Sequence, residues 1–250
     1  MINLTGKVAL ITGGSRGIGA ATASKLAEAG ADIAITYRSD LRNARRIERQ
    51  IQTIGSRCVA FRADASSQSD VRKCVRQAVS RFGRIDILVN NAGIWKRAPV
   101  RSMTERQWDE TLNINLKGTF FFTREVVLFM KHGGKIINVS STAGQRGEAY
   151  HSHYAASKGA VIAFTKSVAV ELAPLNILVN CVAPGWVDTD MSRPALGKRS
   201  SRRSIEQSIP RGSVASPDDI AGPILFLASD LSNHLIGATL SVNGGSVMVT

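Results

Sequence analysis

The chain has 250 residues, of which 44% are hydrophobic and 20% charged, and its formal net charge is +13. These values fit an ordinary globular protein and exclude a disordered chain. No apolar run is long enough to cross a bilayer, and residues 1–7 are too polar for a signal peptide, so we expect a cytoplasmic protein without a membrane partner.

Short β-type runs alternate with helical patterns from one end of the chain to the other. Strands are predicted at 8–11, 33–36, 59–62, 85–89, 136–139, 178–182 and 240–242. Helices are predicted at 19–29, 41–54, 69–82, 104–130, 154–172 and 217–228. Strands separated by helices form βαβ units, so we predict an α/β fold with a doubly wound, seven-stranded parallel sheet of Rossmann type and helices on both faces, in three layers.

No linker rich in Pro, Gly or Ser divides the chain, so residues 1–250 are predicted to form a single domain. The one irregular stretch, 185–216, is long, polar and basic, and it follows the end of a predicted strand. Ligands bind at such strand ends in open α/β sheets. We interpret 185–216 as a substrate lid with one or two short helices, the alternative being a flexible surface loop.

A glycine-rich turn, Thr12-Gly13-Gly14-Ser15-Arg16-Gly17-Ile18-Gly19, joins the first strand to the first helix. Glycines allow the backbone to approach a phosphate closely, and a helix N-terminus offers free N–H groups and partial positive charge. The GxxxGxG spacing differs from the general GxGxxG fingerprint, and a plain strand–helix turn is the alternative. The position of the turn nevertheless favours a dinucleotide site.

The second strand ends at Tyr37, Arg38 and Ser39, where NAD-binding sheets place an acid against the ribose hydroxyl. A guanidinium pairs instead with a 2′-phosphate through charge-assisted hydrogen bonds, and Arg16 approaches the same phosphate. We therefore predict NADP(H) in preference to NAD(H), the alternative for Arg38 being a solvated surface charge. Asp40 is expected to begin the next helix, where a carboxylate suits the helix dipole.

Tyr154 and Lys158 lie four residues apart at the start of a predicted helix and so share one face. An ammonium near a tyrosine is expected to lower the pKa of the phenol and to make it a usable acid or base. This spacing also arises by chance, and it carries weight only together with the other motifs.

Taken together, the motifs resemble those of the short-chain dehydrogenase/reductase family, in order and over almost the whole chain. They are the glycine turn, Asp64, Asn90-Asn91-Ala92-Gly93, Asn115, Ser141, Tyr154 with Lys158, and Pro184-Gly185 with Thr189. The resemblance is closest to the single-domain branch that includes 3-oxoacyl-carrier-protein reductases, sugar dehydrogenases and carbonyl reductases. It implies hydride transfer between a nicotinamide cofactor and a ketone/secondary alcohol pair.

The resemblance also implies a catalytic group in which Tyr154 exchanges a proton with the substrate oxygen and Lys158 tunes Tyr154 and binds the nicotinamide ribose. Ser141 hydrogen-bonds the substrate, and Asn115 holds a water for proton relay. We choose Ser141 over Ser140, and Asn115 over Asn113, from their local sequence context.

The cofactor site that follows from the strand ends and the resemblance contains residues from six segments. They are Gly13, Ser15, Arg16, Gly17, Ile18, Gly19, Tyr37, Arg38, Ser39, Asp64, Ala65, Asn91, Ala92, Gly93, Tyr154, Lys158, Pro184, Gly185, Val187 and Thr189. Within this set, Asp64 and the Ala65 backbone would bind the adenine, and Asn91 would line the adenosine ribose. Val187 and Thr189 would hold the carboxamide, and Asn90 would brace the strands.

The substrate is expected to be a small carbonyl or alcohol, acidic or carrier-bound if the basic lid attracts it. Five side chains that follow strand ends or flank Tyr154 are candidates for the pocket wall, the alternative being that they pack the lid on the core: Trp95, Gln145, His151, Trp186 and Met191. His151 or His153 is expected to line the pocket rather than to bind a metal, since no third ligand is suitably spaced. The family resemblance further implies a homotetramer.

Basic residues gather in two clusters, neither of which is interleaved with the aromatic residues that nucleic-acid stacking requires. The first is a helix face with Arg42, Arg45, Arg46 and Arg49, and the second contains Lys198, Arg199, Arg202 and Arg203. No nucleic-acid partner is therefore predicted. The alternatives that stay open are a sugar or cyclic-alcohol dehydrogenase and a non-catalytic nucleotide-binding sensor. The three scattered cysteines predict buried, reduced thiols.

Overall fold

A single parallel sheet of seven strands organises the computed structural model, which describes residues 2–131 and 133–248. The strands lie in the order β3-β2-β1-β4-β5-β6-β7. Their bounds are β1 (Val8–Ile11), β2 (Asp32–Tyr37), β3 (Cys58–Arg62), β4 (Ile87–Asn90), β5 (Gly134–Val139), β6 (Ile177–Pro184) and β7 (Thr239–Val242). The predicted α/β fold is confirmed, with every strand bound within two residues of its prediction.

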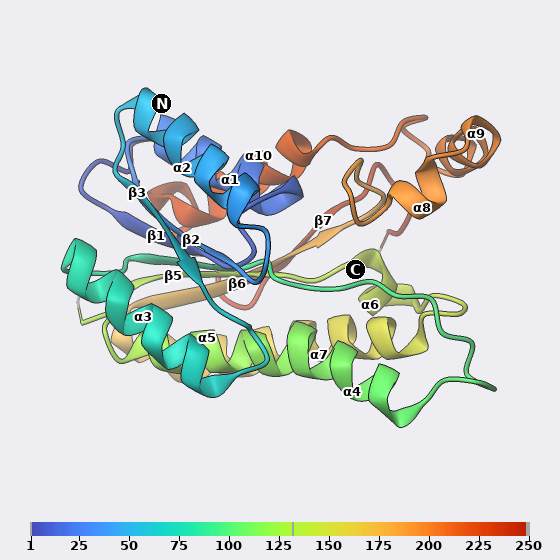
Figure 1. Ribbon diagram of the computed structural model, residues 1–250, viewed down its shortest axis with the longest axis horizontal. Helices are drawn as coiled ribbons and strands as arrows, with labels where there is room; N and C mark the ends of the chain where they lie inside the picture. The colour runs from blue at the N-terminus through green and yellow to red at the C-terminus, as the bar shows by residue number, and fades with distance from the viewer. Residues whose placement is uncertain (1, 132, 249–250) are drawn as a thin grey trace.

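Helices cover both faces of the sheet and give the predicted three layers (Figure 1). One face carries α1 (Gly17–Glu28), α2 (Leu41–Ile54) and α10 (Pro217–Ala228), and the other carries α3 (Gln68–Phe82), α5 (Gly118–Val127) and α7 (Ser152–Leu172). Successive side chains of a strand point to opposite faces. In β1, Ala9 and Ile11 accordingly join the core beneath the first set of helices, and Val8 and Leu10 join the other.

The helix that begins at the end of β2 starts as predicted. The Asp40 carboxylate caps α2 by accepting a hydrogen bond from the Asn43 amide, at 3.0 Å. The helix ends at Gly55, whose φ of 102° suits glycine. Its apolar face is buried, which leaves the predicted arginine cluster on the outer, solvent-facing side.

The prediction of one helix over 104–130 is wrong in its detail. The structure has α4 (Glu105–Leu112), a π-helical segment η1 (Asn113–Lys117) and then α5. Thr104 forms a capping box with Gln107 and therefore precedes the helix. A π-turn inserts one residue without ending the helix, so the apolar pattern of the sequence does not reveal it.

The segment 185–216 stands at the end of the sheet where the carboxyl ends of the strands open (Figure 1). It contains two short helices, α8 (Arg193–Leu196) and α9 (Arg199–Gln207), in agreement with the predicted one or two. Arg202 in α9 donates hydrogen bonds to Asp188 at 2.6 Å and to Glu206 at 2.9 Å.

The remaining elements are short. They are α6 (Thr142–Arg146), which follows β5, and the 3₁₀ turns η2 (Ala173–Leu175) and η3 (Asp230–Ser232). The three cysteines are free and buried, as predicted. Within residues 2–131 and 133–248, no helix has the length and apolar character that a membrane span needs.

Candidate active site

The glycine turn after β1 is drawn tightly against the end of β2. The Gly13 amide donates to the Thr36 hydroxyl at 3.1 Å and the Gly14 amide donates to the Thr36 carbonyl at 3.0 Å. Gly13 and Gly17 have φ values of 65° and 54°, which few other residues adopt. A Cβ at Gly19 would lie 2.4 Å from the Gly13 carbonyl oxygen.

The N-terminus of α1 lies open above this turn. Its N-cap residue, Arg16, makes no side-chain hydrogen bond to the helix. Free N–H groups at a helix start, beside a backbone without side chains, form a cradle for a phosphate group. Ser15 is buried within the turn, and Ile18 lines the pocket described below.

Basic side chains surround the end of β2. Arg38 and Ser39 are exposed, and Arg38 shares a surface hollow with Arg62, Lys73 and Asp64. One Asp64 oxygen, Oδ1, accepts hydrogen bonds from Ser66. The hollow therefore offers both a basic side, which suits a phosphate, and an acidic side, which suits an adenine amino group.

Arg16 connects this region to the lid. Its guanidinium lies 3.8 Å from the Asp190 carboxylate, and its charge contributes to lowering the pKa of Asp40 after the hydrogen bonds from Asn43. Asp190 also pairs with Arg193 in α8. The start of α1, the start of α2 and the lid therefore meet at Arg16.

The two asparagines after β4 have different partners. The Asn90 amide nitrogen donates to Asn138 Oδ1 at 2.9 Å and to Thr123 Oγ1 at 3.1 Å, which confirms that it braces β4 and β5. The Asn91 amide nitrogen donates to the carbonyls of Thr12, at 2.9 Å, and Gly13, at 3.2 Å. Asn91 therefore also fixes the glycine turn, a contact that the sequence did not predict.

Tyr154 and Lys158 lie on the first turns of α7, and both are buried. Lys158 Nζ donates to the Val139 carbonyl at the end of β5, at 2.7 Å. The Ser140 hydroxyl donates to the Lys158 carbonyl, also at 2.7 Å. Burial lowers the pKa of Lys158 to about 8, because the interior disfavours its charged form.

The prediction that Lys158 lowers the pKa of Tyr154 is wrong for this structure. Burial raises the pKa of Tyr154 to about 12, and a hydrogen bond with Ser141 opposes the rise only in part. Lys158 Nζ lies 6.0 Å from the centre of the Tyr154 ring, and it faces the Val139 carbonyl. Desolvation of the phenolate is therefore the main cause of the raised pKa of Tyr154.

Asn115 lies in the π-helical segment and is fully buried. Its Oδ1 accepts from the Ile94 amide at 2.8 Å, and its Nδ2 donates to the Ile94 carbonyl at 3.0 Å and to Ser157 Oγ at 3.1 Å. The side chain thus joins the loop after β4 to α7 at the residue before Lys158.

The two serines that follow β5 have different hydrogen-bond partners. The Ser140 hydroxyl is committed to the Lys158 carbonyl, whereas the Ser141 hydroxyl lies beside Tyr154 and caps α6 by accepting from the Ala143 amide at 3.1 Å. This arrangement favours the choice of Ser141 as the serine that faces a substrate.

Gly144 lets α6 touch the backbone of α7. A Cβ at this position would lie 2.5 Å from the Lys158 carbonyl carbon. Gly144→Ala is therefore expected to push α6 away and to lower the free energy of unfolding by about 1–3 kcal/mol, measured by urea titration.

Gly222→Ala in α10 is the matched control. Apart from its chain neighbours and the backbone of its own helix, no atom lies within 4 Å of a Cβ there, and Pro223 offsets the gain in helix propensity, so the free energy of unfolding should change by less than about 0.5 kcal/mol. Equal effects of the two substitutions would refute the packing argument.

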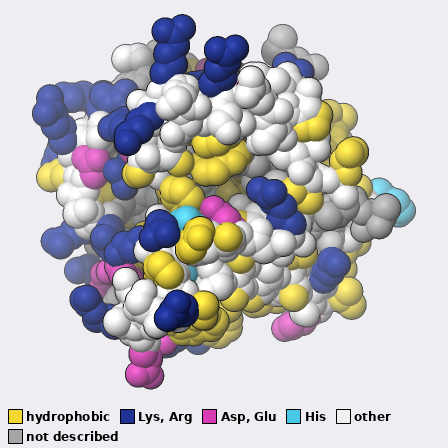
Figure 2. All heavy atoms as spheres, turned by 90° about the vertical axis from the view of Figure 1, so that its right-hand side faces the viewer, with side chains coloured by type: hydrophobic (Ala, Val, Ile, Leu, Met, Phe, Trp, Pro, Cys, Tyr) yellow, Lys and Arg dark blue, Asp and Glu magenta, His cyan; other side chains and the backbone are white. Residues whose placement is uncertain are grey.

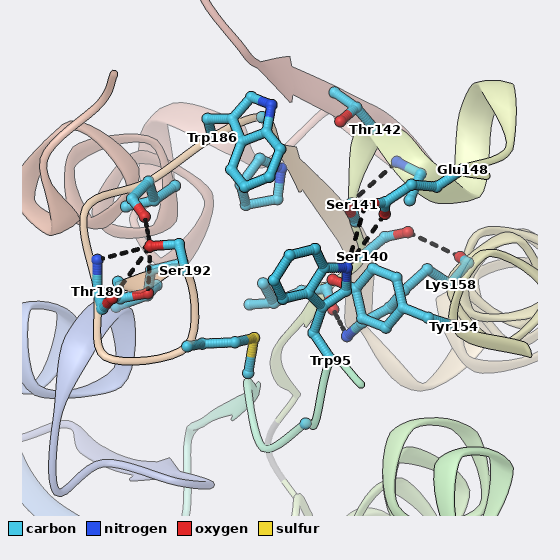
Figure 3. Close-up of a pocket in the computed structure, with 18 of the residues that line it drawn as sticks. Trp95, Ser140, Ser141, Thr142, Glu148, Tyr154, Lys158, Trp186, Thr189 and Ser192 are labelled. Atoms are coloured by element: carbon cyan, nitrogen blue, oxygen red, sulfur yellow. Dashed lines mark hydrogen bonds between the residues drawn. The ribbon is translucent and has the colours of Figure 1, made fainter. Parts of the chain in front are cut away.

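A pocket runs from the α1 start to Tyr154 and is walled by aromatic side chains (Figure 3). Trp95, Trp186 and Met191 line it, as predicted. The two indole rings meet edge to face, with centroids 5.7 Å apart. Lys and Arg side chains gather around the hollow on this face of the molecule (Figure 2).

The prediction that Gln145 and His151 line this pocket is wrong. Gln145 donates to Ser241 Oγ at 2.9 Å, and His151 stacks on the outer face of Trp95 at 4.4 Å. His153 is also outside it, fully buried and without a hydrogen-bond partner among the described residues. Burial lowers the pKa of His153, so it stays neutral.

The pocket also contains two charged residues that were not predicted from the sequence, Arg146 and Glu148. Arg146 ends the short helix α6 and Glu148 lies in the loop that follows, and a segment this short has no periodic pattern that gives a side chain's direction. The part of the chain that the structure describes contains no group of three His, Cys, Asp or Glu side chains able to hold a metal ion.

Comparison with known proteins agrees with this fold and site. Residues 13–247 match the family model described as enoyl-(acyl carrier protein) reductase. The chain is 38% identical to the 3-oxoacyl-(acyl-carrier-protein) reductase of Aquifex aeolicus over 98% of both chains. It is 39% identical to a 2-dehydro-3-deoxy-D-gluconate 5-dehydrogenase of Dickeya dadantii over 97% of this chain and 96% of that protein.

Solved structures give the same result. A dehydrogenase/reductase from Sinorhizobium meliloti superposes with a TM-score of 0.94 at 38% identity, covering 98% of this chain and 97% of that one. A Serratia marcescens short-chain dehydrogenase/reductase superposes with a TM-score of 0.92 at 37% identity, covering 97% of this chain and 98% of that one. The fold is that of these proteins, and the chain is an oxidoreductase. The chain belongs to the short-chain dehydrogenase/reductase family.

Proposed function

We propose that the protein is an NADP(H)-dependent oxidoreductase that interconverts a ketone and a secondary alcohol. The observation that carries this proposal is the pocket itself: Tyr154, Ser141 and Lys158 lie at one end, and Ile18 and Thr189, beside the glycine turn, line the other. A nicotinamide dinucleotide with its phosphates at the α1 start would place its reactive ring in this pocket.

The side chains divide the chemistry among them. When bound, the nicotinamide supplies or accepts the hydride. Tyr154 gives its proton to the carbonyl oxygen during reduction and takes it back from the alcohol during oxidation. Ser141 orients that oxygen by a hydrogen bond. Lys158 binds the nicotinamide ribose and supports Tyr154, and Asn115 holds a water for proton relay.

The dinucleotide fits the residues that are present. The glycine turn has no room for side chains where the phosphates would pass, and Thr189 lies against it, 3.3 Å from a Cβ built on Gly17. The Val187 carbonyl accepts from Ser192, and its amide has no partner among the described residues, so it suits the carboxamide. Arg38 favours the 2′-phosphate of NADP(H) over the free hydroxyl of NAD(H).

The remaining residues of the proposed cofactor site lie along the dinucleotide that would be bound between the glycine turn and Tyr154. It comprises Gly13, Ser15, Arg16, Gly17, Ile18 and Gly19 at the turn, Tyr37 and Ser39 beside Arg38, Asp64 and Ala65 at the adenine, Asn91, Ala92 and Gly93 after β4, and Pro184 and Gly185 after β6. We propose that residues 1–250 act as one catalytic domain, with 185–216 as its substrate lid.

The names of the relatives suggest two substrate classes. A 3-oxoacyl thioester is the first, from the reductases of which Aquifex aeolicus provides one. A sugar-derived substrate is the second, from the Dickeya dadantii dehydrogenase. A non-catalytic sensor is less well supported, because Asn115, Ser141, Tyr154 and Lys158 are all present.

We further propose a homotetramer. Large apolar side chains are exposed on or next to α4, α5 and α7, among them Trp108, Phe120, Leu128 and Val170, and Met248 is exposed near the C-terminus. A second copy that covers these side chains would remove apolar area from water.

The function is tested with a panel of carbonyl compounds, including 3-oxoacyl thioesters, sugars and cyclic ketones, by following NADPH absorbance. We expect turnover of at least one class with NADPH in preference to NADH. Tight NADPH binding without turnover of any compound would favour the sensor, and salt-dependent binding to DNA alone would favour the nucleic-acid alternative.

A further inference from the structure

Glu148 places a carboxylate in the pocket that holds Tyr154 and Ser141. Its side chain is 23% exposed, and its charge is one of the causes that raise the pKa of Tyr154, so the two groups are close. Glu148 is the only acidic residue among the described residues that line the pocket. The proposed reaction assigns no role to the Glu148 carboxylate.

The carboxylate has acceptor capacity to spare. Both of its oxygens face the single Trp95 indole N–H, each at 3.2 Å, and Oε1 lies 3.5 Å from His151 Nδ1 (Figure 3). A carboxylate group has several acceptor sites, and one indole N–H occupies only part of this capacity. The geometry therefore leaves room for a further donor from the pocket side.

The donor is a hydroxyl rather than an ammonium group. Arg146 and Lys158 also line the pocket, and Lys and Arg side chains surround its mouth (Figure 2). A net charge of +13 adds to a field that repels cations and attracts anions. A neutral hydroxyl reaches Glu148 without opposing that field.

Arg146 supplies the complementary group. It lies at the end of α6, two residues before Glu148, and it forms no ion pair within the described part of the chain. Its exposed guanidinium at the pocket edge suits a carboxylate or phosphate, which it can bind with two parallel hydrogen bonds.

We propose that Glu148 and Arg146 select a hydroxyketone that carries an anionic group, as in a polyhydroxylated keto acid. Glu148 accepts from a hydroxyl close to the reacting carbonyl, and Arg146 binds the anion. This inference rests on the proposed function, since it takes the carbonyl to lie at Tyr154 and Ser141. It favours the sugar-derived class over the 3-oxoacyl thioesters.

Matched substrates test the hydroxyl contact. The kcat/KM with NADPH for 5-hydroxy-4-oxopentanoate should exceed that for 4-oxopentanoate by about tenfold or more, the effect of one hydrogen bond to a charged group. Glu148→Gln keeps an acceptor for Trp95 and should erase most of this preference, read as the ratio of the two kcat/KM values so that any change common to both substrates cancels. Glu28→Gln, at an exposed site on α1, removes the same charge and should change neither rate.

The anion contact is tested with the methyl esters of the same two ketones. Arg146→Gln should lower kcat/KM for the acids about tenfold more than it lowers kcat/KM for the esters. Equal losses on all four compounds would mean that either residue only shapes the pocket, and would overturn the proposal. A preference of the wild type for an amino ketone over the hydroxyketone would overturn it as well.

Binding decides the inference even if turnover fails. Trp95 and Trp186 line the pocket and Trp108 is exposed, so Trp108→Phe leaves tryptophan fluorescence as a report on the pocket. The inference is supported if 5-hydroxy-4-oxopentanoate quenches this fluorescence with a lower dissociation constant than 4-oxopentanoate, and if Glu148→Gln removes that difference. This result does not depend on whether NADPH is consumed. If no ketone is turned over, the proposed function fails; if ketones are turned over without preference for the hydroxyl, the inference fails alone.

Discussion

Tyr154→Phe is expected to lower kcat for ketone reduction by about 10³-fold, within the range that positioned acids contribute. Phenylalanine keeps the ring that packs at the start of α7 and removes only the hydroxyl. Because the buried ring is retained, the variant should remain folded and should still bind NADPH, as followed by fluorescence titration.

Tyr150→Phe is the natural control, since Tyr150 is 57% exposed and lies outside the pocket lining. It should retain full activity. A Tyr154→Phe variant that keeps turnover within about tenfold of the wild type would remove Tyr154 from the role of acid.

The pH dependence follows from the same pair of residues. Burial raises the pKa of Tyr154 to about 12, so its hydroxyl keeps the proton that reduction needs throughout the neutral range. Burial lowers the pKa of Lys158 to about 8, so reduction should decline above about pH 8 as the ammonium loses its charge. Alcohol oxidation needs the deprotonated tyrosine and should instead rise with pH across the neutral range.

Arg38→Asp is expected to weaken NADPH binding by about tenfold or more and to strengthen NADH binding, because an acid at this strand end can accept a hydrogen bond from the free ribose hydroxyl. The substitution removes one or two charge-assisted hydrogen bonds to the 2′-phosphate, each worth about 1.5–3 kcal/mol, and places a like charge beside it. The ratio of the two dissociation constants, measured at low ionic strength, reports the change directly.

Arg49→Asp is the control that distinguishes a direct ion pair between Arg38 and the 2′-phosphate from the general positive field of the protein. Arg49 is exposed on α2 and the substitution changes the net charge by the same amount. If it weakens NADPH as much as Arg38→Asp does, the preference comes from the overall charge and the pairing argument fails.

Much of the framework could be predicted because local patterns determine it. The run Val8–Ile11 is apolar on both faces, as a strand covered on both sides must be, and Asp40 and Gly55 mark the two ends of α2. Tyr154 and Lys158 meet because four residues make about one helical turn.

The remaining features depend on contacts between distant segments. Gln145 and Arg146 are adjacent in the sequence, yet Gln145 hydrogen-bonds Ser241 in β7 whereas Arg146 lines the pocket. The direction of Gln145 therefore depends on the position of β7, which lies far away in the sequence. Glu148 enters the pocket because Trp95, 53 positions earlier in the chain, holds it. The pKa of Tyr154 likewise depends on how deeply its side chain is buried. The four-residue spacing between Tyr154 and Lys158 gives no information about that burial.

The π-helical segment has a consequence for how this enzyme can vary. Each residue of a regular helix turns the chain by about 100°, so η1 offsets the face of α4 from the face of α5. Deleting one residue from Asn113–Lys117 would restore a regular helix and rotate Phe122 and Val126 out of the core, or else carry Asn115 away from Ile94. Here the chain tolerates a change of side chain far better than a change of length.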